Sequence, residues 1–97
     1  MESFVYILKC ADNSYYVGVT SNLYDRISEH NSGKYRNSYT FNRLPVTLVF
    51  YTTFTEITTA IEFEKKLKKW SRSKKEALIH NKFDTLPNLS KKNFNIK

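Results

Sequence analysis

The sequence predicts an α+β domain in which helices flank a three-stranded antiparallel sheet, with the elements in the order β-β-α-β-α-α. Runs of aromatic and β-branched residues at 4–9, 15–20 and 46–54 predict the strands. Helix-capping residues followed by apolar residues at helical spacing predict the helices. A chain of 97 residues holds one such domain, which we place at residues 1–83, followed by a C-terminal tail at 84–97.

The first two strands are expected to form a hairpin. Turn-forming residues occupy 11–14, and Asn13 tolerates the positive φ of a tight turn. Tyr6 in the first strand and Tyr16 in the second can then project from one face, which Gly18 shares. A glycine inside a strand usually marks a close approach to the backbone. Core packing is the alternative role for each tyrosine.

The first helix is expected to follow the hairpin directly. Ser21 or Asn22 can cap its start by accepting a hydrogen bond from a free backbone N–H group. Asp25 lies near the positive end of the helix dipole. Residues 31–33 form a typical C-terminal stop, and the polar residues 34–45 are predicted to be a loop.

Two further helices are predicted after the third strand. Thr55 or Thr58 can cap a long helix that ends near Trp70. Ser73 can cap a short helix that continues through Ile79.

The net charge of +7 is concentrated in one segment, residues 65–75, which we call the basic segment. It carries seven basic residues and no acidic one, while the other nine basic residues are balanced by nine acidic residues. Such a patch attracts phosphate backbones through Coulomb energy and counterion release, although a solvated helix face is the alternative. The candidate nucleic-acid-binding residues are Lys65, Lys68, Lys69, Arg72, Lys74 and Lys75.

Composition argues against several classes of protein. The single Cys10 excludes an intrachain disulfide, and with His30 and His80 it cannot complete a usual four-ligand zinc site. The apolar run at 4–8 is too short for a signal peptide or a membrane span. We therefore expect a cytoplasmic protein with no membrane partner.

A carboxylate interrupts the apolar stripe of the long helix. At 100° per residue, Glu64 lies between Ile57 and Ala60 in angle and should face the sheet. A buried charge requires a partner. The sequence leaves two interpretations open: an ion pair with Lys68 four residues on, or a metal ligand or general acid/base. The predicted stripe comprises Ile57, Ala60, Phe63, Leu67 and Trp70.

Arg26 and His30 lie four residues apart on the first helix and share an edge with Leu23. Together they can converge on a phosphate, because the guanidinium fork matches two phosphate oxygens. The alternative is a surface arginine paired with Glu29 or Asp25, beside a solvated histidine.

These motifs resemble the GIY-YIG nuclease superfamily, and more narrowly its short stand-alone proteins, over roughly residues 3–80. The matching segments are Val5-Tyr6-Ile7-Leu8, Tyr16-Val17-Gly18-Val19-Thr20, Leu23-Tyr24-Asp25-Arg26 with His30, Pro45-Val46, and Ala60 with the stretch from Glu64 to Ile79. The sequence departs from the family pattern at Phe4 and Val17, where the motifs name Gly and Ile, and at Asn13, where Gly is common. Phe4 and Val17 occupy packing positions, so we expect no loss of chemistry.

The resemblance assigns both tyrosines to an active site. Tyr6 matches the tyrosine of the first motif and Tyr16 that of the second, while Gly18 matches a structural glycine. Tyr6 is the first candidate to activate or position the attacking water, with His30 lowering the cost of ionising a phenol whose pKa is about 10. Tyr16 and His30 remain alternatives for this role.

The resemblance also assigns an arginine, a histidine and a metal ligand. Arg26 matches the catalytic arginine and His30 the histidine one turn later. Glu64 matches the metal-binding glutamate, which implies one Mg²⁺ or Mn²⁺ ion held mainly through oxygen and water ligands.

The implied function is a divalent-metal-dependent endonuclease that hydrolyses DNA phosphodiester bonds, with RNA as an alternative substrate. Without a base-reading motif, we expect structure- or damage-directed cleavage, as in DNA repair, or weakly specific nicking. The alternative is a non-catalytic nucleic-acid-binding module that uses the basic segment. The sequence predicts no oligomeric state.

Overall fold

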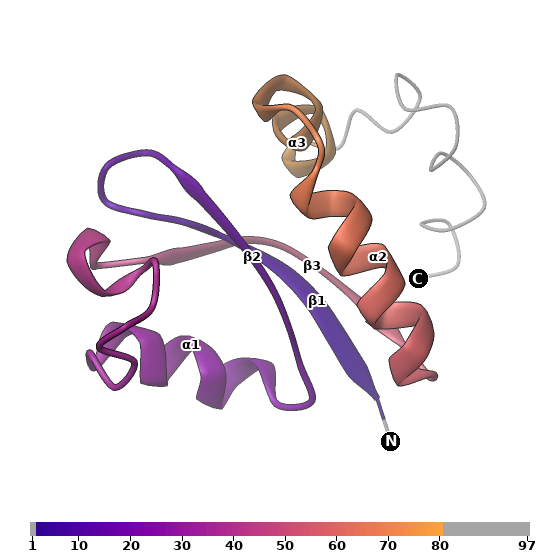
Figure 1. The fold of residues 1–97 in the computed structure, drawn as a ribbon, viewed down its shortest axis with the longest axis horizontal. Coiled ribbons are helices and arrows are strands. Elements are labelled where there is room, and N and C mark those ends of the chain that lie inside the picture. The colour runs from indigo at the N-terminus through magenta and orange to yellow at the C-terminus, as the bar shows by residue number, and fades with distance from the viewer. Residues whose placement is uncertain (1, 81–97) are drawn as a thin grey trace.

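The computed structural model describes residues 2–80 and confirms the α+β class and the predicted order of elements (Figure 1). The strands are β1 (Ser3–Lys9), β2 (Tyr15–Thr20) and β3 (Thr47–Phe54). The helices are α1 (Leu23–Asn31), α2 (Ile57–Lys68) and α3 (Arg72–Ile79), with a short 3-10 helix at Phe41–Arg43. Within this part of the chain, no helix is long and apolar enough to cross a membrane. The tail predicted at 84–97 lies outside the described residues.

β1 lies at the centre of the sheet, between β2 and β3, and pairs antiparallel with both. The turn between β1 and β2 places Asn13 at φ 70°, in the left-handed region predicted for it. Tyr6 lies opposite Gly18, and Leu8 lies opposite Tyr16. Residues opposite each other share a face, so the two tyrosines project from the same face, as expected.

The sheet separates two apolar cores, which gives the molecule three layers (Figure 1). Beneath α1, the core comprises Tyr6, Leu8, Cys10 and Val46, with Leu23 and Ile27 packed against it. Beneath α2 and α3, the core comprises Val5, Ile7, Val17, Ala60, Leu67 and Leu78. Alternate residues of β1 and β2 therefore supply opposite faces of the sheet.

The start of α1 agrees with the prediction, and the start of α2 differs from it. Asn22 caps α1, because its side-chain oxygen accepts a hydrogen bond from the backbone N–H of Asp25 at 3.2 Å. The residue preceding α2 is Glu56, which makes no side-chain cap, so the predicted caps Thr55 and Thr58 are wrong. The Glu56 carbonyl accepts the first helical hydrogen bond, and this sets where α2 begins.

The junction between α2 and α3 also lies earlier than predicted. α2 ends at Lys68 and not near Trp70, because the backbone N–H of Trp70 bonds the carbonyl of Leu67 and tightens the last turn. Ser71, and not Ser73, then caps α3 by accepting a backbone N–H at 3.2 Å.

The loop at 34–45 is tied to the rest of the fold at its ends. The side-chain amide of Asn31 accepts from the backbone N–H of Val46 at 2.8 Å and donates to its carbonyl at 3.1 Å. Nε of Arg43 donates to Asp12 in the hairpin turn at 3.0 Å. These bonds fix the position of the loop beside α1 and β2.

Candidate active site

Tyr6 lies across Gly18 on the α1 side of the sheet. The tyrosine is fully buried, and a Cβ placed on Gly18 would lie 2.5 Å from its hydroxyl oxygen and 2.6 Å from its Cζ. Atoms at these distances overlap strongly. Glycine is therefore required for the ring to occupy this position, which confirms the close approach expected from the sequence.

Gly18→Ala is expected to lower the free energy of unfolding by about 1–3 kcal/mol, because the added methyl group forces Tyr6 or β2 to move. Urea unfolding followed by circular dichroism measures this change. The same substitution in a Tyr6→Leu background, which lacks the colliding hydroxyl, should cost less. An equal cost in both backgrounds would contradict the collision.

Tyr16 connects Tyr6 to α1 and to the loop. Its ring centroid lies 6.4 Å from that of Tyr6, 5.3 Å from that of His30 and 6.2 Å from that of Tyr39. The Tyr16 and Tyr39 rings are stacked at an interplanar angle of 21°. The guanidinium of Arg43 lies 3.8 Å from the centre of the Tyr39 ring. Aromatic side chains from β1, β2, α1 and the loop therefore meet beside β2.

Arg26 and His30 line the same pocket, as predicted for residues that share a helical face. The pocket has a volume of about 280 Å³ and is lined by Tyr16, Arg26, His30, Tyr35, Ser38 and Tyr39. The Nε of Arg26 lies 3.7 Å from Oε1 of Glu29, so the alternative pairing with Glu29 is also present. Because the Arg26 side chain is 37% exposed, its charge remains accessible to a ligand.

His30 is buried, which overturns the alternative interpretation of a solvated histidine. It is 3% exposed, its Nδ1 lies 2.8 Å from Oγ1 of Thr40, and its Nε2 has no hydrogen-bond partner among residues 2–80. Burial lowers the pKa of His30, and the positive charge of Arg26 lowers it further, whereas Glu29 opposes this shift. The neutral imidazole is therefore favoured near neutral pH.

The buried hydroxyl of Tyr6 also makes no hydrogen bond of normal geometry within the described part of the chain, although the nearby guanidinium of Arg26 favours its ionised form. Burial raises the pKa of Tyr6 to about 12, Tyr16 adds to the rise, and Arg26 opposes it. In the free protein, ionising Tyr6 therefore costs more than ionising an exposed tyrosine. Buried polar groups without partners are rare, so Tyr6 and His30 mark a place where a bound group can complete the hydrogen bonding.

Glu64 faces inward and is paired with Lys68, so the structure contains features of both interpretations left open by the sequence. The Glu64 side chain is 11% exposed, and its Oε2 lies 2.8 Å from Nζ of Lys68. The hydrogen bond from Lys68 to Glu64 raises the pKa of Lys68. Ile57 departs from the predicted apolar stripe and is 51% exposed, because α2 becomes buried only from Ala60 onward.

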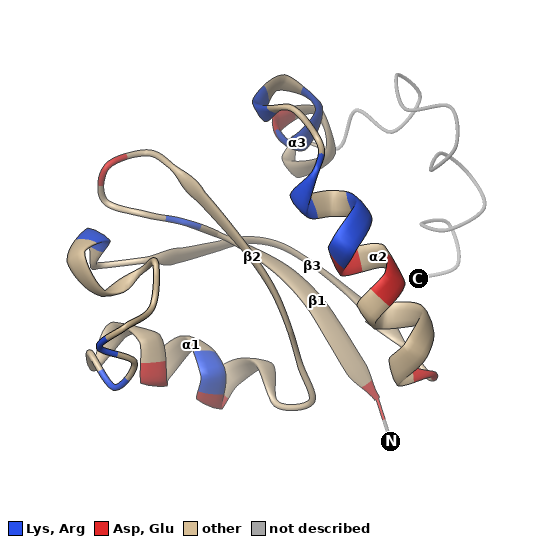
Figure 2. Cartoon of the chain, viewed as in Figure 1, with Lys and Arg blue, Asp and Glu red and all other residues tan. Residues whose placement is uncertain are grey.

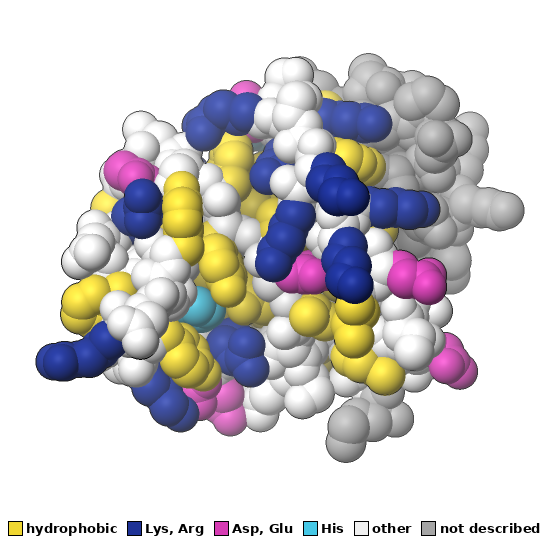
Figure 3. Space-filling model, in the orientation of Figure 1, with side chains coloured by type: hydrophobic (Ala, Val, Ile, Leu, Met, Phe, Trp, Pro, Cys, Tyr) yellow, Lys and Arg dark blue, Asp and Glu magenta, His cyan; other side chains and the backbone are white. Residues whose placement is uncertain are grey.

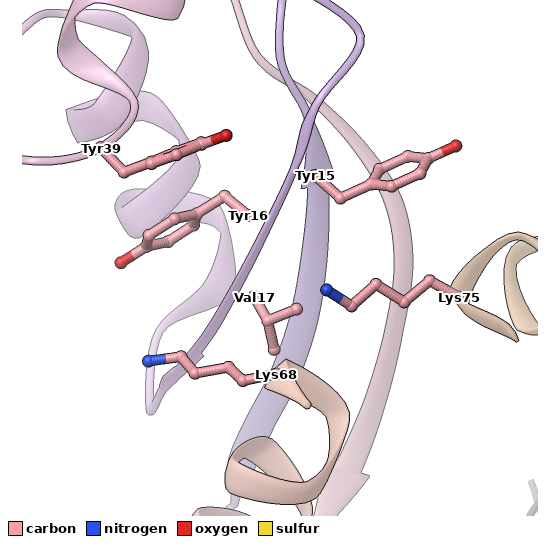
Figure 4. Close-up of a pocket in the computed structure, with 6 residues that line it drawn as sticks. All are labelled: Tyr15, Tyr16, Val17, Tyr39, Lys68 and Lys75. Carbon is pink, nitrogen blue, oxygen red and sulfur yellow. The ribbon is translucent and has the colours of Figure 1, made fainter. Parts of the chain in front are cut away.

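Lys68 and Lys75 contribute to a second pocket, which adjoins the first. It has a volume of about 300 Å³ and is lined by Tyr15, Tyr16, Val17, Tyr39, Lys68 and Lys75 (Figure 4). Both pockets contain Tyr16 and Tyr39, and together we call them the cleft. Consecutive residues 15–17 point to alternate faces of the sheet, so the cleft passes around the outer edge of β2. Figure 4 shows Lys68 reaching from α2 toward Tyr16.

The basic segment runs along the C-terminal half of α2 and into α3 (Figure 2). Its side chains gather over these helices on one face of the molecule (Figure 3). Lys68 and Lys75 line the cleft, whereas Arg72 pairs with Glu76 at 3.1 Å and Lys74 lies 4.7 Å from the centre of the Trp70 ring. The segment therefore supplies charge both inside the cleft and along its border.

The sequence matches the model of the GIY-YIG catalytic domain over residues 2–77, which is most of the chain. The chain belongs to the GIY-YIG family. The resemblance drawn from its motifs is thereby confirmed. Membership implies nuclease-type activity on a nucleic acid, and nucleases of this family generally use divalent metal ions.

Relatives of this GIY-YIG domain include small proteins of similar length. It is 42% identical over 78 residues to a UPF0213 protein of Syntrophus aciditrophicus, covering 80% of this chain and 90% of that one. It is 43% identical over 79 residues to the UPF0213 protein YazA of Bacillus subtilis, and the match covers 81% of this chain and 79% of that one. The solution structure of the UPF0213 protein BH0048 from Bacillus halodurans is similar, with a TM-score of 0.55 and 41% identity. The match covers 84% of this chain and 86% of that one.

The side chains of this GIY-YIG domain fit a hydrated divalent ion and not a closed metal cage. Residues 2–80 contain no group of three or more His, Cys, Asp or Glu side chains that could hold an ion. Mg²⁺ is often bound by one or two carboxylates, with waters and substrate phosphates completing its shell. Glu64 provides one inward-facing carboxylate, and its partner Lys68, whose side chain is 54% exposed, lines the cleft.

Sequence reasoning missed Thr40 of this GIY-YIG domain. Its side chain is buried and contacts His30 through Nδ1. It lies in a polar loop with no apolar periodicity, so nothing in the sequence distinguishes it from its neighbours.

Proposed function

We propose that this GIY-YIG domain is a divalent-metal-dependent endonuclease that hydrolyses phosphodiester bonds in DNA. The observation that supports this proposal is the convergence of chemically suitable groups on one cleft. Arg26 and His30 line its α1 side. Lys68 lines its α2 side and forms an ion pair with Glu64. Tyr16 lines both pockets. A phosphate bound beside Tyr16 would meet the guanidinium of Arg26 on one side and, on the other, the ammonium of Lys68, which pairs with Glu64.

Arg26 would bind the phosphate and neutralise charge that builds on its oxygens in the transition state. The hydroxyl of Tyr16 would bind the phosphate or orient the attacking water. An ion held by Glu64 would supply stabilisation of the leaving oxygen when bound. Lys68, released from Glu64, would then contact a neighbouring phosphate.

Tyr6 remains the first candidate to accept the proton of the attacking water. Its pKa of about 12 makes this costly in the free protein, and Arg26 already reduces the cost. His30 would reduce the cost further by accepting the Tyr6 proton as the phenol ionises. Tyr16 and His30 are the alternatives for this role.

We also propose that recognition rests on phosphates and not on base sequence. Lysines and arginines in and around the cleft are suited to phosphate contacts, which carry no sequence information directly. Recognition through phosphates would lead to structure- or damage-directed cleavage, as in DNA repair, or to weakly specific nicking. RNA remains an alternative substrate, because phosphate contacts distinguish RNA from DNA poorly.

The proposal is tested by incubating the full chain with supercoiled, branched and single-stranded DNA. Cleavage is expected with Mg²⁺ or Mn²⁺ and should disappear with EDTA. Binding to all substrates without cleavage in either metal would instead support the non-catalytic nucleic-acid-binding module.

Changing Lys69, Lys74 and Lys75 to Gln is expected to weaken DNA binding and flatten its dependence on salt. The slope of log K against log salt should fall by about 0.9 for each phosphate that the variant no longer neutralises, on any DNA sequence. Fluorescence anisotropy at several salt concentrations measures the slope. Lys9→Gln removes an exposed charge outside the basic segment and serves as the control. An unchanged slope in the triple variant would place the nucleic acid on another surface.

A further inference from the structure

The hydroxyl of Thr40 is the nearest polar partner of His30. Thr40 is 1% exposed, and its Oγ1 lies 2.8 Å from Nδ1 of His30 and 3.0 Å from Oγ of Ser38. The backbone N–H of Thr40 donates to the same Ser38 oxygen at 3.2 Å. A hydrogen-bonded chain therefore runs from the half-buried Ser38 through the buried Thr40 to the histidine ring.

The hydrogen bonds from Ser38 through Thr40 to His30 permit two proton arrangements, because a neutral imidazole carries one hydrogen on its two ring nitrogens. In the first, His30 Nδ1–H donates to Thr40, Thr40 donates to Ser38, and Nε2 carries a lone pair. In the second, Ser38 donates to Thr40, Thr40 donates to Nδ1, and Nε2 carries the hydrogen. Each arrangement satisfies Thr40, so the surroundings of Nε2 decide between them.

The pocket that His30 lines also contains the guanidinium of Arg26. Nε2 is shielded from solvent and has no partner among residues 2–80, so a hydrogen on it would be a buried N–H without an acceptor, which is rare in proteins. Arg26 offers only donors, and its positive charge lowers the pKa of His30, which favours the neutral ring. A lone pair on Nε2 fits these surroundings and a hydrogen does not.

We propose that Thr40 is a positioning residue whose hydroxyl holds His30 in the tautomer protonated on Nδ1, leaving Nε2 as a hydrogen-bond acceptor in the active site. The acceptor would receive a hydrogen bond from a tyrosine hydroxyl or from the attacking water. This catalytic use rests on the proposed nuclease function, whereas the tautomer is a property of the free protein.

The tautomer is tested by long-range ¹H–¹⁵N NMR of the free full chain, without metal or DNA. We expect His30 to show a protonated Nδ1 and an unprotonated Nε2 in the wild type and in Thr40→Ser, which keeps the hydroxyl. In Thr40→Val the population should shift toward the Nε2–H form. Thr52→Val, on β3, is the matched control and should leave His30 unchanged. A wild-type ring protonated on Nε2, or an unchanged ring in Thr40→Val, would overturn the proposal.

The kinetic consequence is measured separately on the same variants. Thr40→Val is expected to lower kcat by about 10- to 100-fold with little change in KM, which is less than the full contribution of a positioned acid or base, and Thr40→Ser should restore most of it. Amide spectra establish that each variant is folded. If no protein cleaves DNA but the ring spectra are as expected, the nuclease proposal fails while the tautomer stands. Equal kcat in Thr40→Val and wild type would overturn the positioning role.

Discussion

Glu64→Gln is expected to abolish metal-dependent cleavage while the fold and the affinity for DNA are largely retained. Glutamine keeps the shape of the side chain and an acceptor for Lys68, but it removes the charge that would hold a divalent ion. The loss should amount to several kcal/mol of transition-state stabilisation, or about a thousandfold in rate. Single-turnover nicking with Mg²⁺ or Mn²⁺ measures it, and anisotropy reports DNA binding.

Glu62→Gln is the matched control, because Glu62 lies on the same helix and is exposed. It removes the same charge two residues away and should cleave at the wild-type rate. Cleavage by Glu64→Gln at the wild-type rate, under the same metal, would remove Glu64 from the active site.

Arg26→Gln is expected to lower kcat by about 10²- to 10³-fold, the cost typical of losing a preorganised donor to a developing anion. Arg26→Lys should recover part of this loss, because it keeps the charge but not the planar fork that binds two phosphate oxygens. Arg36→Gln, in the neighbouring loop, removes an exposed charge and is the control. Equal rates for the Arg26 and Arg36 variants would contradict the assignment.

The Arg26 variants also carry a readout that does not depend on activity. The positive charge of Arg26 lowers the pKa of His30 and opposes the rise in the pKa of Tyr6. Its removal should therefore raise the pKa of both groups, and NMR titration of the free protein can follow His30. A His30 pKa that does not move would show that the two side chains are not coupled.

Much of the fold was predictable because its signals are local. The hairpin follows from two β-branched and aromatic runs around Asn13, and the start of α1 follows from the side chain of Asn22. The caps of α2 and α3 were wrong because several threonines and serines near each start can cap equally well. The first helical hydrogen bond sets the start: it places Glu56, which has no side-chain cap, before α2 and the capping Ser71 before α3.

The candidate site was predictable as a set of residues but not as a set of contacts. Arg26 and Glu64 stand out because polar groups at apolar positions conflict with simple packing, whereas Tyr6 stands out through the family motif. Their partners depend on the tertiary fold. The position of Tyr39 on Tyr16 and of Thr40 on His30 is set by a loop that is fixed through hydrogen bonds between distant residues. No sequence period encodes such bonds.

Among residues 2–80, no strand pairs with the outer edge of β2, and this has a consequence for assembly. Exposed edge strands can extend their sheet by pairing with another chain. Here the cleft passes around this edge, with Tyr15 and Tyr16 on either side of it. A peptide or second copy that pairs along β2 would occupy the space needed by the substrate, whereas pairing along β3 would leave it open. Extension of the sheet at β3 is therefore compatible with an open cleft, whereas extension at β2 would block substrate binding.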